Sequence, residues 1–260
     1  MSDVEARLSA VLDRYDSLAI AVSGGVDSMT LATIAHRRNR GRIAVIHAVS
    51  PAVPPAATLR VRARALREGW DLSVTGAGEF EDERYRANPA DRCYFCKTNL
   101  YARIRALTRW RIASGANTGD LGDYRPGLLA AAERDIVHPF IEAGIDKPEV
   151  RVLARRFGLD EVAELPAQPC LASRVETGIA IDADDLAFVD RVETALARLA
   201  PANATLRCRV THKGIVVELG ADAAPMAPLL HDAARALCDA ASRPFLGVQD
   251  YRKGAMFVRG

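Results

Sequence analysis

The stretch AVSGGVDSMTLA, residues 21–32, decides how the rest of this sequence is interpreted. It begins in an apolar run that ends at Ser23 and is typical of a buried β-strand. Two glycines follow, and then Asp27 and Ser28, which are favourable residues at the start of a helix. A strand, a glycine turn and a helix in this order direct backbone N–H groups at one point, so the stretch predicts an anion-binding loop.

Each residue of the loop suits a phosphate ligand. Gly24 and Gly25 let the backbone approach phosphate oxygens without a Cβ in the way, and Ser23 and Ser28 offer hydroxyl groups. Asp27 is positioned to help hold Mg²⁺. The loop lacks the G-K-[ST] of a Walker A motif and the G-x-G-x-x-G of a dinucleotide fingerprint. The alternative is a plain strand-to-helix turn with a Ser/Asp cap.

The strand before the loop (18–23) is the first of a series. Similar short apolar runs occur at 42–50, 71–77 and 111–117, and each is separated from the next by a segment long enough for a helix. We therefore expect an α/β fold with a parallel sheet and helices on both faces. In such folds the functional loops lie at the carboxyl ends of the strands.

A well-signalled helix follows at 146–160. Asp146 caps it, Pro148 and Glu149 stand in its first turn, and Gly158 ends it.

The composition then changes in ELPAQPCLASRVETG (164–178), which has prolines and little periodicity. We place a domain boundary here, between an α/β domain at 1–166 and a small α+β domain at 167–260 for substrate binding or oligomerisation. The second domain should contain a helix (184–200), a hairpin (204–220), a second helix (226–242) and a last strand pair (245–258).

The segment GANTGDLGDYRPG (115–127) follows a strand, so its polar residues should lie at the carboxyl rim of the sheet. Asn117, Asp120 and Asp123 are candidates to bind metal or nucleotide, and Arg125 to face phosphate or carboxylate. The alternative is a capped loop rich in turn residues.

The chain has 5 cysteines, an odd number that favours thiols or metal ligands over a disulfide framework. Cys93 and Cys96 form a C-x-x-C motif without a second such motif elsewhere. A redox dithiol and a structural zinc site are both open alternatives for this pair, although zinc lacks an evident fourth ligand. Cys208 and Cys238 are expected to pack as small hydrophobic residues.

The bulk composition excludes some classes of protein. With 35 basic and 33 acidic residues the net charge is +2, which gives no support for a nucleic-acid partner. No run of about 18 apolar residues is present, and the first residues predict an amphipathic helix rather than a signal peptide. We therefore expect a cytoplasmic protein without a membrane partner.

The motif SGGVDS resembles the pyrophosphate loop of the PP-loop ATP pyrophosphatases, which include NAD synthetase, GMP synthetase and tRNA-thiolating enzymes. Three further stretches, at 88–101, 115–127 and 165–178, are together similar to the ATP-dependent sulfur transferases that build the nickel-pincer cofactor of lactate racemase. This resemblance runs through nearly the whole chain and is strongest before residue 180. It implies an enzyme that uses ATP and Mg²⁺ to adenylate a carboxylate and then replaces the activated oxygen with sulfur.

The resemblance also assigns residues. It implies adenine contacts around His47 to Ser50, and a sulfur-donating role for Cys170. In one form of the family the cysteine at this position gives up its own sulfur. In the other form it joins two more cysteines in holding a four-iron four-sulfur cluster. Because Cys93 and Cys96 are present, we expect the cluster form.

On the substrate side, the resemblance points to residues of the second domain. Arg207, Arg209 and Glu218 match the substrate-side pattern of the family, although alternation in a half-exposed strand explains them nearly as well. Arg174 is the candidate phosphate contact because the implied substrate is a nucleotide. Members of the family usually have an acidic residue just before a strand that begins with Tyr-Arg. In this chain the corresponding stretch is LGVQDYRKG (246–254), and Asp250 is not assigned the role of that acidic residue.

The resemblance thus implies a sulfur transferase that acts on a pyridinium carboxylate mononucleotide, and it also suggests a homo-oligomer. The alternatives are a PP-loop ligase that amidates a small molecule or thiolates tRNA, and an ATP-binding sensor without catalysis. The cysteine trio argues against amidation, and the near-neutral charge argues against tRNA.

Overall fold

The computed structural model describes residues 2–38, 42–122, 126–252 and 254–256. The chain forms two compact units. The first comprises Met1–Asp82 and Asp91–Leu165, and the second comprises Glu83–Ala90 and Pro166–Gly260. Asp123 and Arg125, two of the candidate site residues, lie outside the described residues. No helix in the described ranges is long and apolar enough to cross a membrane.

The first unit contains the predicted parallel sheet. Its strands are β1 (Leu18–Val22), β2 (Ile43–Val49), β3 (Asp71–Gly76) and β4 (Arg111–Ala113). They run in the order β3-β2-β1-β4, and all neighbouring pairs are parallel. The α/β prediction and all four strands predicted for this sheet are therefore confirmed.

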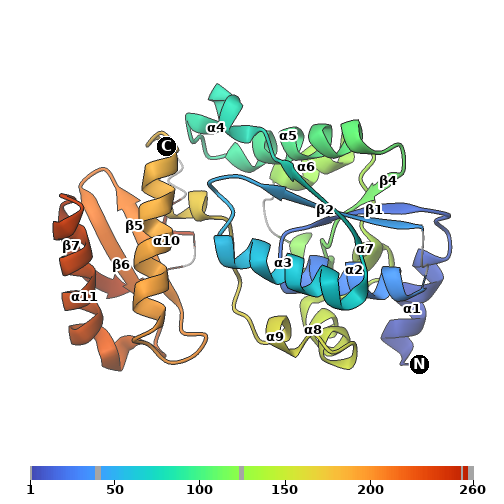
Figure 1. Cartoon of the computed structure of the whole chain (residues 1–260). Coiled ribbons are helices and arrows are strands. Elements are labelled where there is room, and N and C mark those ends of the chain that lie inside the picture. The colour runs from blue at the N-terminus through green and yellow to red at the C-terminus, as the bar shows by residue number, and fades with distance from the viewer. Residues whose placement is uncertain (1, 39–41, 123–125, 253, 257–260) are drawn as a thin grey trace. The chain divides into compact units, whose positions relative to one another are not determined.

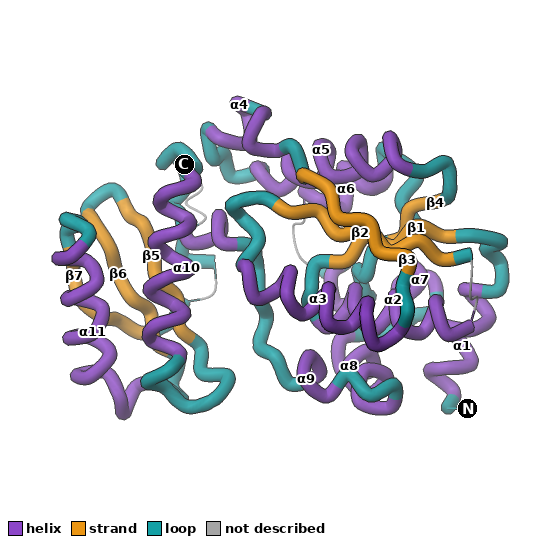
Figure 2. The backbone as a smooth tube through the Cα atoms, in the orientation of Figure 1, coloured by secondary structure: helices purple, strands orange, loops and turns teal. Residues whose placement is uncertain are grey.

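Helices cover both faces of this sheet, as Figure 1 and Figure 2 show. One face carries α5 (Arg92–Leu107) and α6 (Pro126–Ala132), and the other carries α2 (Val26–Arg38), α3 (Pro55–Glu68) and α8 (Lys147–Arg156). The unit also contains α1 (Asp3–Leu12), α7 (Pro139–Glu142), α9 (Asp160–Ala163) and the 3-10 helices η1 (Glu79–Glu81) and η2 (Thr118–Asp120).

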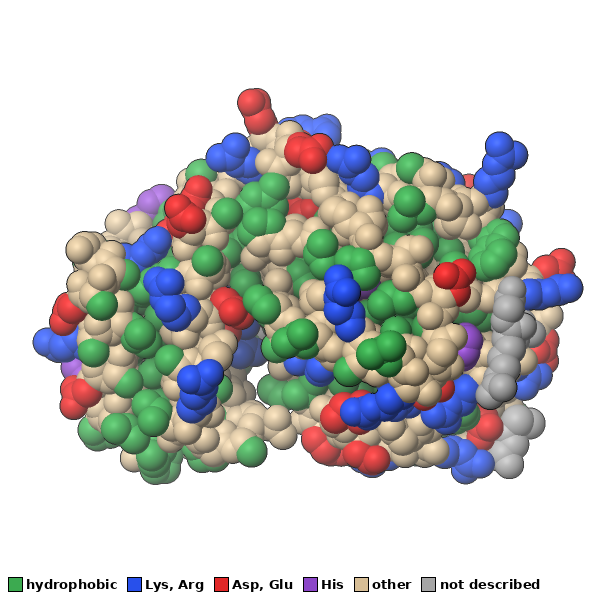
Figure 3. Space-filling view, in the orientation of Figure 1, with side chains coloured by type: hydrophobic (Ala, Val, Ile, Leu, Met, Phe, Trp, Pro, Cys, Tyr) green, Lys and Arg blue, Asp and Glu red, His purple; other side chains and the backbone are tan. Residues whose placement is uncertain are grey.

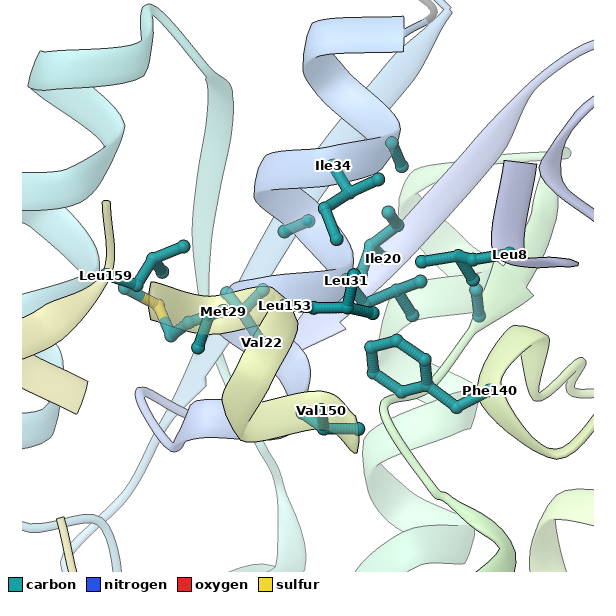
Figure 4. Packing of buried hydrophobic residues seen from close by; sticks show 14 of the residues in the cluster. Leu8, Ile20, Val22, Met29, Leu31, Ile34, Phe140, Val150, Leu153 and Leu159 are labelled. Atoms are coloured by element: carbon teal, nitrogen blue, oxygen red, sulfur yellow. The ribbon is translucent and has the colours of Figure 1, made fainter. Parts of the chain in front are cut away.

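The alternation of side chains along the strands divides the core between the two faces. Ile20 and Val22 point to the face of α2 and α8, where they join a large cluster that includes Leu31 and Leu153 (Figure 4). Ala19 belongs instead to a smaller cluster under α5 and α6. Both faces of β1 are therefore sealed by apolar packing, which holds the carboxyl end of the strand in a fixed place.

The predicted signals of α8 are confirmed. Asp146 and Glu149 form a reciprocal capping box, in which each side chain accepts a hydrogen bond from the backbone N–H of the other residue. Gly158 follows the last turn with φ +70°, a left-handed conformation that suits glycine. Arg7 braces the segment before the helix by donating to the carbonyl oxygens of Ala143 (2.7 Å) and Gly144 (3.0 Å).

The second unit has a three-stranded sheet in the order β5-β6-β7. Its strands are β5 (Leu206–Thr211), β6 (Gly214–Leu219) and β7 (Phe245–Asp250), and its helices are α4 (Glu83–Arg86), α10 (Ala183–Ala197) and α11 (Ala227–Ala240), with the 3-10 helices η3 (Leu171–Arg174) and η4 (Ala224–Met226). β5 and β6 form the predicted antiparallel hairpin, whereas β7 runs parallel to β6. The predicted helices of this unit are both present.

The prediction of a last strand pair at 245–258 is wrong for the described residues, which contain β7 alone. The chain turns after Asp250, and the carbonyl oxygen of Met256 accepts hydrogen bonds from the N–H and the hydroxyl of Thr177. The carbonyl oxygen of Met256 is therefore bonded to the loop before α10 and not to β7.

The sequence also gave no sign that Glu83–Ala90 leaves the first unit. Asn88 explains this excursion, since its side-chain amide donates to the carbonyl oxygens of Glu176 and Ile179, both at 2.9 Å. The backbone carbonyl oxygen of Asn88 accepts a hydrogen bond from the N–H of Gly178 at 3.1 Å. Asn88 is fully buried and has φ +53°, a conformation that Asn tolerates better than most residues.

Candidate functional site

The strand order brings together two loops that are far apart in the sequence. β2 lies on one side of β1 and β4 on the other, so the chain leaves the carboxyl ends of β1 and β4 at a topological switch point, where open α/β sheets bind ligands. Gly115, just after β4, packs against the first turn of α2. A Cβ on Gly115 would lie 2.6 Å from the backbone nitrogen of Ser28, so only glycine allows this approach.

The loop after β1 is held by its own serines. The hydroxyl of Ser28 accepts a hydrogen bond from the backbone N–H of Ser23 at 3.0 Å and lies 3.2 Å from the Ser23 hydroxyl. These bonds close the turn between the end of β1 and the start of α2. The loop thus has a defined shape without a ligand, as a preorganised anion site requires.

The two loop glycines have different roles. Gly24 has φ +80°, and a Cβ there would lie 2.7 Å from the carbonyl oxygen of Ala57, so the fold itself requires glycine. A Cβ on Gly25 would meet only the Ser23 hydroxyl within 4 Å, at 3.6 Å. Gly25 therefore leaves open space that the fold does not need.

Asp27 is the centre of a polar cluster. Its Oδ1 accepts from the Asn117 side-chain amide at 3.2 Å, and its Oδ2 accepts from Lys147 Nζ at 2.5 Å. Asp120 Oδ2 in turn accepts from the backbone N–H of Asn117 at 3.0 Å. Three residues predicted from two motifs that are far apart in the sequence, Asp27 in one and Asn117 and Asp120 in the other, are thus brought together by the fold.

Lys147 is the residue of this cluster that the sequence analysis missed. It is the first residue of α8, where the helix dipole disfavours a positive charge. A lysine at this position gains from an anionic partner, which the structure supplies in Asp27, although no local sequence signal identifies that partner.

Both ring nitrogens of His47 have hydrogen-bond partners within the first unit. Its side chain is fully buried, Nδ1 lies 2.9 Å from the carbonyl oxygen of Val22, and Nε2 lies 2.9 Å from the Thr58 hydroxyl. A carbonyl oxygen only accepts, so Nδ1 carries the proton and Nε2 accepts from Thr58 in the neutral ring. Burial lowers the pKa of His47 below its ordinary value. The imidazole therefore joins β1 and β2 to α3 as a neutral structural group.

Cys93 and Cys96 lie one turn apart at the start of α5, and both are partly exposed. Cys170 is also partly exposed and immediately precedes η3 in the second unit. Cys208 and Cys238 are buried, as predicted, and burial raises the pKa of both thiols. In the described part of the chain, no group of three or more His, Cys, Asp or Glu side chains is arranged to hold a metal ion.

Arg174 is an anchor for the Cys170 segment. Its guanidinium binds both carboxylate oxygens of Glu193, at 3.0 and 2.9 Å, and donates to the carbonyl oxygens of Pro169 (2.7 Å) and Cys170 (3.2 Å). Only 4% of Arg174 is exposed. The segment that carries the thiol is therefore tied to α10 by an ion pair in which the arginine is buried and the glutamate is partly exposed.

β5 is buried from Leu206 to Val210, so alternation in a half-exposed strand, the alternative explanation for its arginines, does not apply. Arg209 pairs with the fully buried Glu218, its Nε lying 2.8 Å from Oε2. Arg207 donates instead to the carbonyl oxygens of Leu206 and Ala167, at 2.7 and 2.8 Å. Burial and then the charge of Arg174 lower the pKa of Arg207. The strand could be buried on both faces because these guanidinium groups find partners within their own unit.

The surface carries both signs of charge. On the face drawn in Figure 3, Lys and Arg side chains are interspersed with Asp and Glu, in keeping with the net charge of +2. Asp250, at the end of β7, is exposed.

The buried neutral His47 predicts a pH effect on stability. Its pKa in the folded protein is lowered from 6.5, so the unfolded chain binds the proton more readily, and stability falls as the pH drops below about 6.5. We expect His47→Gln to lose less unfolding free energy than the unmodified protein between roughly pH 7.5 and 5.5. Urea unfolding at both pH values measures this. The control is His212→Gln in the β5–β6 turn, and an equal pH dependence in all three proteins would contradict the assignment.

The comparisons with known proteins place the chain among relatives. No family model matches it. The uncharacterized protein slr1717 of Synechocystis is 39% identical over 188 residues, which cover 71% of this chain and 70% of that protein. The pyridinium-3,5-bisthiocarboxylic acid mononucleotide synthase of Lactiplantibacillus plantarum is 26% identical over 75% of this chain and 72% of its own length. The uncharacterized protein MJ0830 of Methanocaldococcus jannaschii is 25% identical over 69% of each chain. The chain therefore belongs to the same family as slr1717 of Synechocystis.

Proposed function

We propose that this chain is an ATP-dependent sulfur transferase that acts on a pyridinium carboxylate mononucleotide. It would convert the carboxylate to a thiocarboxylate and release AMP and pyrophosphate. The observation that carries the proposal is the glycine loop at the switch point, where Ser23, Gly25 and Ser28 lie beside the cluster around Asp27. The 26% identity to the mononucleotide synthase supports a role in nickel-pincer cofactor biosynthesis.

The first step activates the substrate. A carboxylate oxygen attacks the α-phosphorus of ATP, the bond to the β-phosphate oxygen breaks, and pyrophosphate leaves. The Ser28 hydroxyl and the N–H groups at the start of α2 would hold the pyrophosphate, Gly25 would leave room for its oxygens, and Asp27 would hold Mg²⁺, which would neutralise charge on the phosphates. The product is an acyl adenylate, whose leaving group is AMP instead of oxide.

The second step brings in sulfur. A sulfide equivalent attacks the carbonyl carbon, and AMP leaves with the oxygen that came from the carboxylate. Cys93, Cys96 and Cys170 are the proposed ligands of a four-iron four-sulfur cluster, which would supply labile sulfide. The thiols fit this role in their exposure, because all three are partly accessible while Cys208 and Cys238 are buried.

The substrate side of the proposal rests on the second unit. Arg174 and Arg209 already bind Glu193 and Glu218, whereas the partners described for Arg207 are carbonyl oxygens and the ring of Tyr251. A buried guanidinium that forms no ion pair among the described residues favours an anionic ligand, such as the phosphate or carboxylate of a mononucleotide.

The alternative functions differ from the proposed one in the second substrate or in the turnover of ATP. An amide ligase or a tRNA-thiolating enzyme would also release AMP and pyrophosphate, but with ammonia or tRNA as a second substrate. A sensor would bind ATP without turnover. Incubation with ATP, Mg²⁺ and a nicotinate-derived carboxylate mononucleotide separates them, because only the proposed function gives AMP, pyrophosphate and thiocarboxylate together.

Two changes in the loop test the activation step. Gly25→Val should abolish AMP formation and leave the fold intact, since the fold does not need the space beside Gly25 that phosphate would occupy. Asp27→Ala should abolish AMP formation as well by removing a metal ligand. Anion-exchange chromatography of the nucleotides measures both. Gly76→Val at the end of β3 is the control, because a Cβ there would meet no atom of the described residues within 4 Å. Turnover that persists in both loop variants would rule out the assignment.

The cysteines decide the origin of the sulfur. If they hold a cluster, protein purified or reconstituted without oxygen should be brown and contain about four irons and four sulfides per chain. Changing Cys93, Cys96 or Cys170 to Ala should then remove iron and sulfur transfer together. Cys238→Ala is the control, because that thiol is buried.

A sacrificial Cys170 makes the opposite prediction. The protein would need no iron, Cys93 and Cys96 would be dispensable, and each chain would react once and lose the mass of hydrogen sulfide at Cys170. Colourless, iron-free protein that thiolates its substrate once per chain would therefore contradict the cluster and leave the ATP chemistry standing.

A further inference from the structure

Arg60 on α3 is a charged residue beside the glycine loop to which neither the motifs nor the comparisons assign a role. Its Nε donates a hydrogen bond to the backbone carbonyl oxygen of Gly24 at 3.2 Å. This carbonyl belongs to the peptide group that joins Gly24 to Gly25, the two glycines of the loop proposed to hold pyrophosphate. Arg60 therefore contacts the backbone of the loop at a point where the loop has no side chain.

The packing of α3 on the loop fixes this contact. Gly24 lies against Ala57, since a Cβ on Gly24 would come within 2.7 Å of the Ala57 carbonyl oxygen. Residues three apart share one face of a helix, so Ala57 and Arg60 approach Gly24 together. The helix is held in turn by the buried Arg64, which donates to two carbonyl oxygens just after α8. Arg60 thus reaches the loop from an anchored helix.

The carbonyl of Gly24 needs a hydrogen-bond donor from outside α2. Gly24 has φ +80°, a left-handed conformation that keeps it out of the helix. The first helical hydrogen bond is instead accepted by the carbonyl of Gly25, from the N–H of Met29 at 3.1 Å. A hydrogen bond from a charged donor is stronger than one from a neutral donor. Arg60 supplies such a bond to the Gly24 carbonyl.

The position of Arg60 suits a cation that serves an anion site. Arg60 is partly buried, and burial lowers the pKa of its guanidinium below the ordinary value. The group stays charged, because arginine remains protonated throughout the physiological pH range. Its charge therefore makes the electrostatic potential at the loop more positive, where pyrophosphate would bring several negative charges.

The bond to Gly24 also sets the direction of the next N–H group. A trans peptide group is planar, so its C=O and N–H bonds point in opposite directions. Because the Gly24 carbonyl is turned to Arg60, the N–H of Gly25 is turned away from it. Among the described residues, none accepts a hydrogen bond from this N–H. It is thus available to an anion at the start of α2.

We propose that Arg60 is a positioning residue of the pyrophosphate site and acts through the peptide group between Gly24 and Gly25. The guanidinium holds the N–H of Gly25 toward the anion and polarises it, because hydrogen bonds in a chain strengthen one another. Arg60 itself does not touch the phosphates. This inference rests on the proposed function, in which the loop binds the pyrophosphate part of ATP.

One NMR signal can report on this peptide group alone, because Gly24 and Gly25 form the only Gly-Gly pair in the chain. Protein made by cell-free synthesis with glycine that carries ¹³C in its carboxyl group and ¹⁵N gives a single HNCO cross-peak, from the Gly24 carbonyl carbon and the Gly25 N–H. The proteins compared are the unmodified chain, Arg60→Met, Arg60→Lys and Arg62→Met. Arg62, an exposed arginine of the same helix, is the matched control. Each is titrated with pyrophosphate and with AMP in the presence of Mg²⁺.

In the unmodified protein we expect pyrophosphate to shift the Gly25 amide proton further downfield than AMP does. Arg60→Met should move the Gly24 carbonyl carbon upfield, because that carbonyl loses a hydrogen bond. It should also weaken pyrophosphate binding roughly fivefold to tenfold, as for the loss of a hydrogen bond to a charged group. Arg60→Lys keeps a charged donor and should stay close to the unmodified protein, and Arg62→Met should match it.

Three results would overturn the inference and leave the proposed function in place. The first is an unchanged carbonyl signal and an unchanged pyrophosphate affinity in Arg60→Met. The second is a weaker affinity with an unchanged carbonyl signal, which would make Arg60 a direct contact of the anion. The third, which needs only the more conservative variant to fold, is an Arg60→Lys protein that keeps its affinity while its carbonyl signal moves upfield.

A different result would reject the proposed function itself. If pyrophosphate moves no signal in the unmodified protein, the loop is not a pyrophosphate site, and the inference about Arg60 fails with it.

Discussion

The candidate site depends on the close approach of Gly115 to the first turn of α2. The loop after β4 can reach Asp27 only because no Cβ stands between Gly115 and the backbone nitrogen of Ser28. From that contact follow the Asn117 bond to Asp27 and, through Thr118 and Ile145, the position of Lys147. Packing on both faces of β1 fixes the strand from which the loop begins.

Local signals predicted much of this arrangement. The apolar runs predicted the parallel strands, because strands buried on both faces are continuously apolar. The two glycines after the first strand predicted the loop, and Asp146 with Glu149 predicted the start of α8. The sequence placed Asn117 and Asp120 at the rim of the sheet, although it could not show that they join Asp27, because that depends on strand order.

The errors arose where a long-range contact overrides a local pattern. Alternating charges in β5 suggested a half-exposed strand, yet Glu218 and nearby carbonyl oxygens allow Arg209 and Arg207 to be buried. Asn88 draws Glu83–Ala90 into the second unit through bonds to residues that lie about ninety positions later in the chain, and no local propensity contains that information.

The central claim is that ATP activates a carboxylate by adenylation, and the path of one oxygen atom tests it most directly. The substrate carboxylate is labelled with ¹⁸O, the reaction is run with unlabelled ATP in unlabelled water, and the products are examined by mass spectrometry. If the carboxylate attacks the α-phosphorus and sulfur then displaces AMP, each AMP carries one ¹⁸O from the substrate, and the thiocarboxylate keeps the other. AMP without ¹⁸O, or label in the pyrophosphate, would contradict an acyl adenylate and with it the role assigned to the loop after β1.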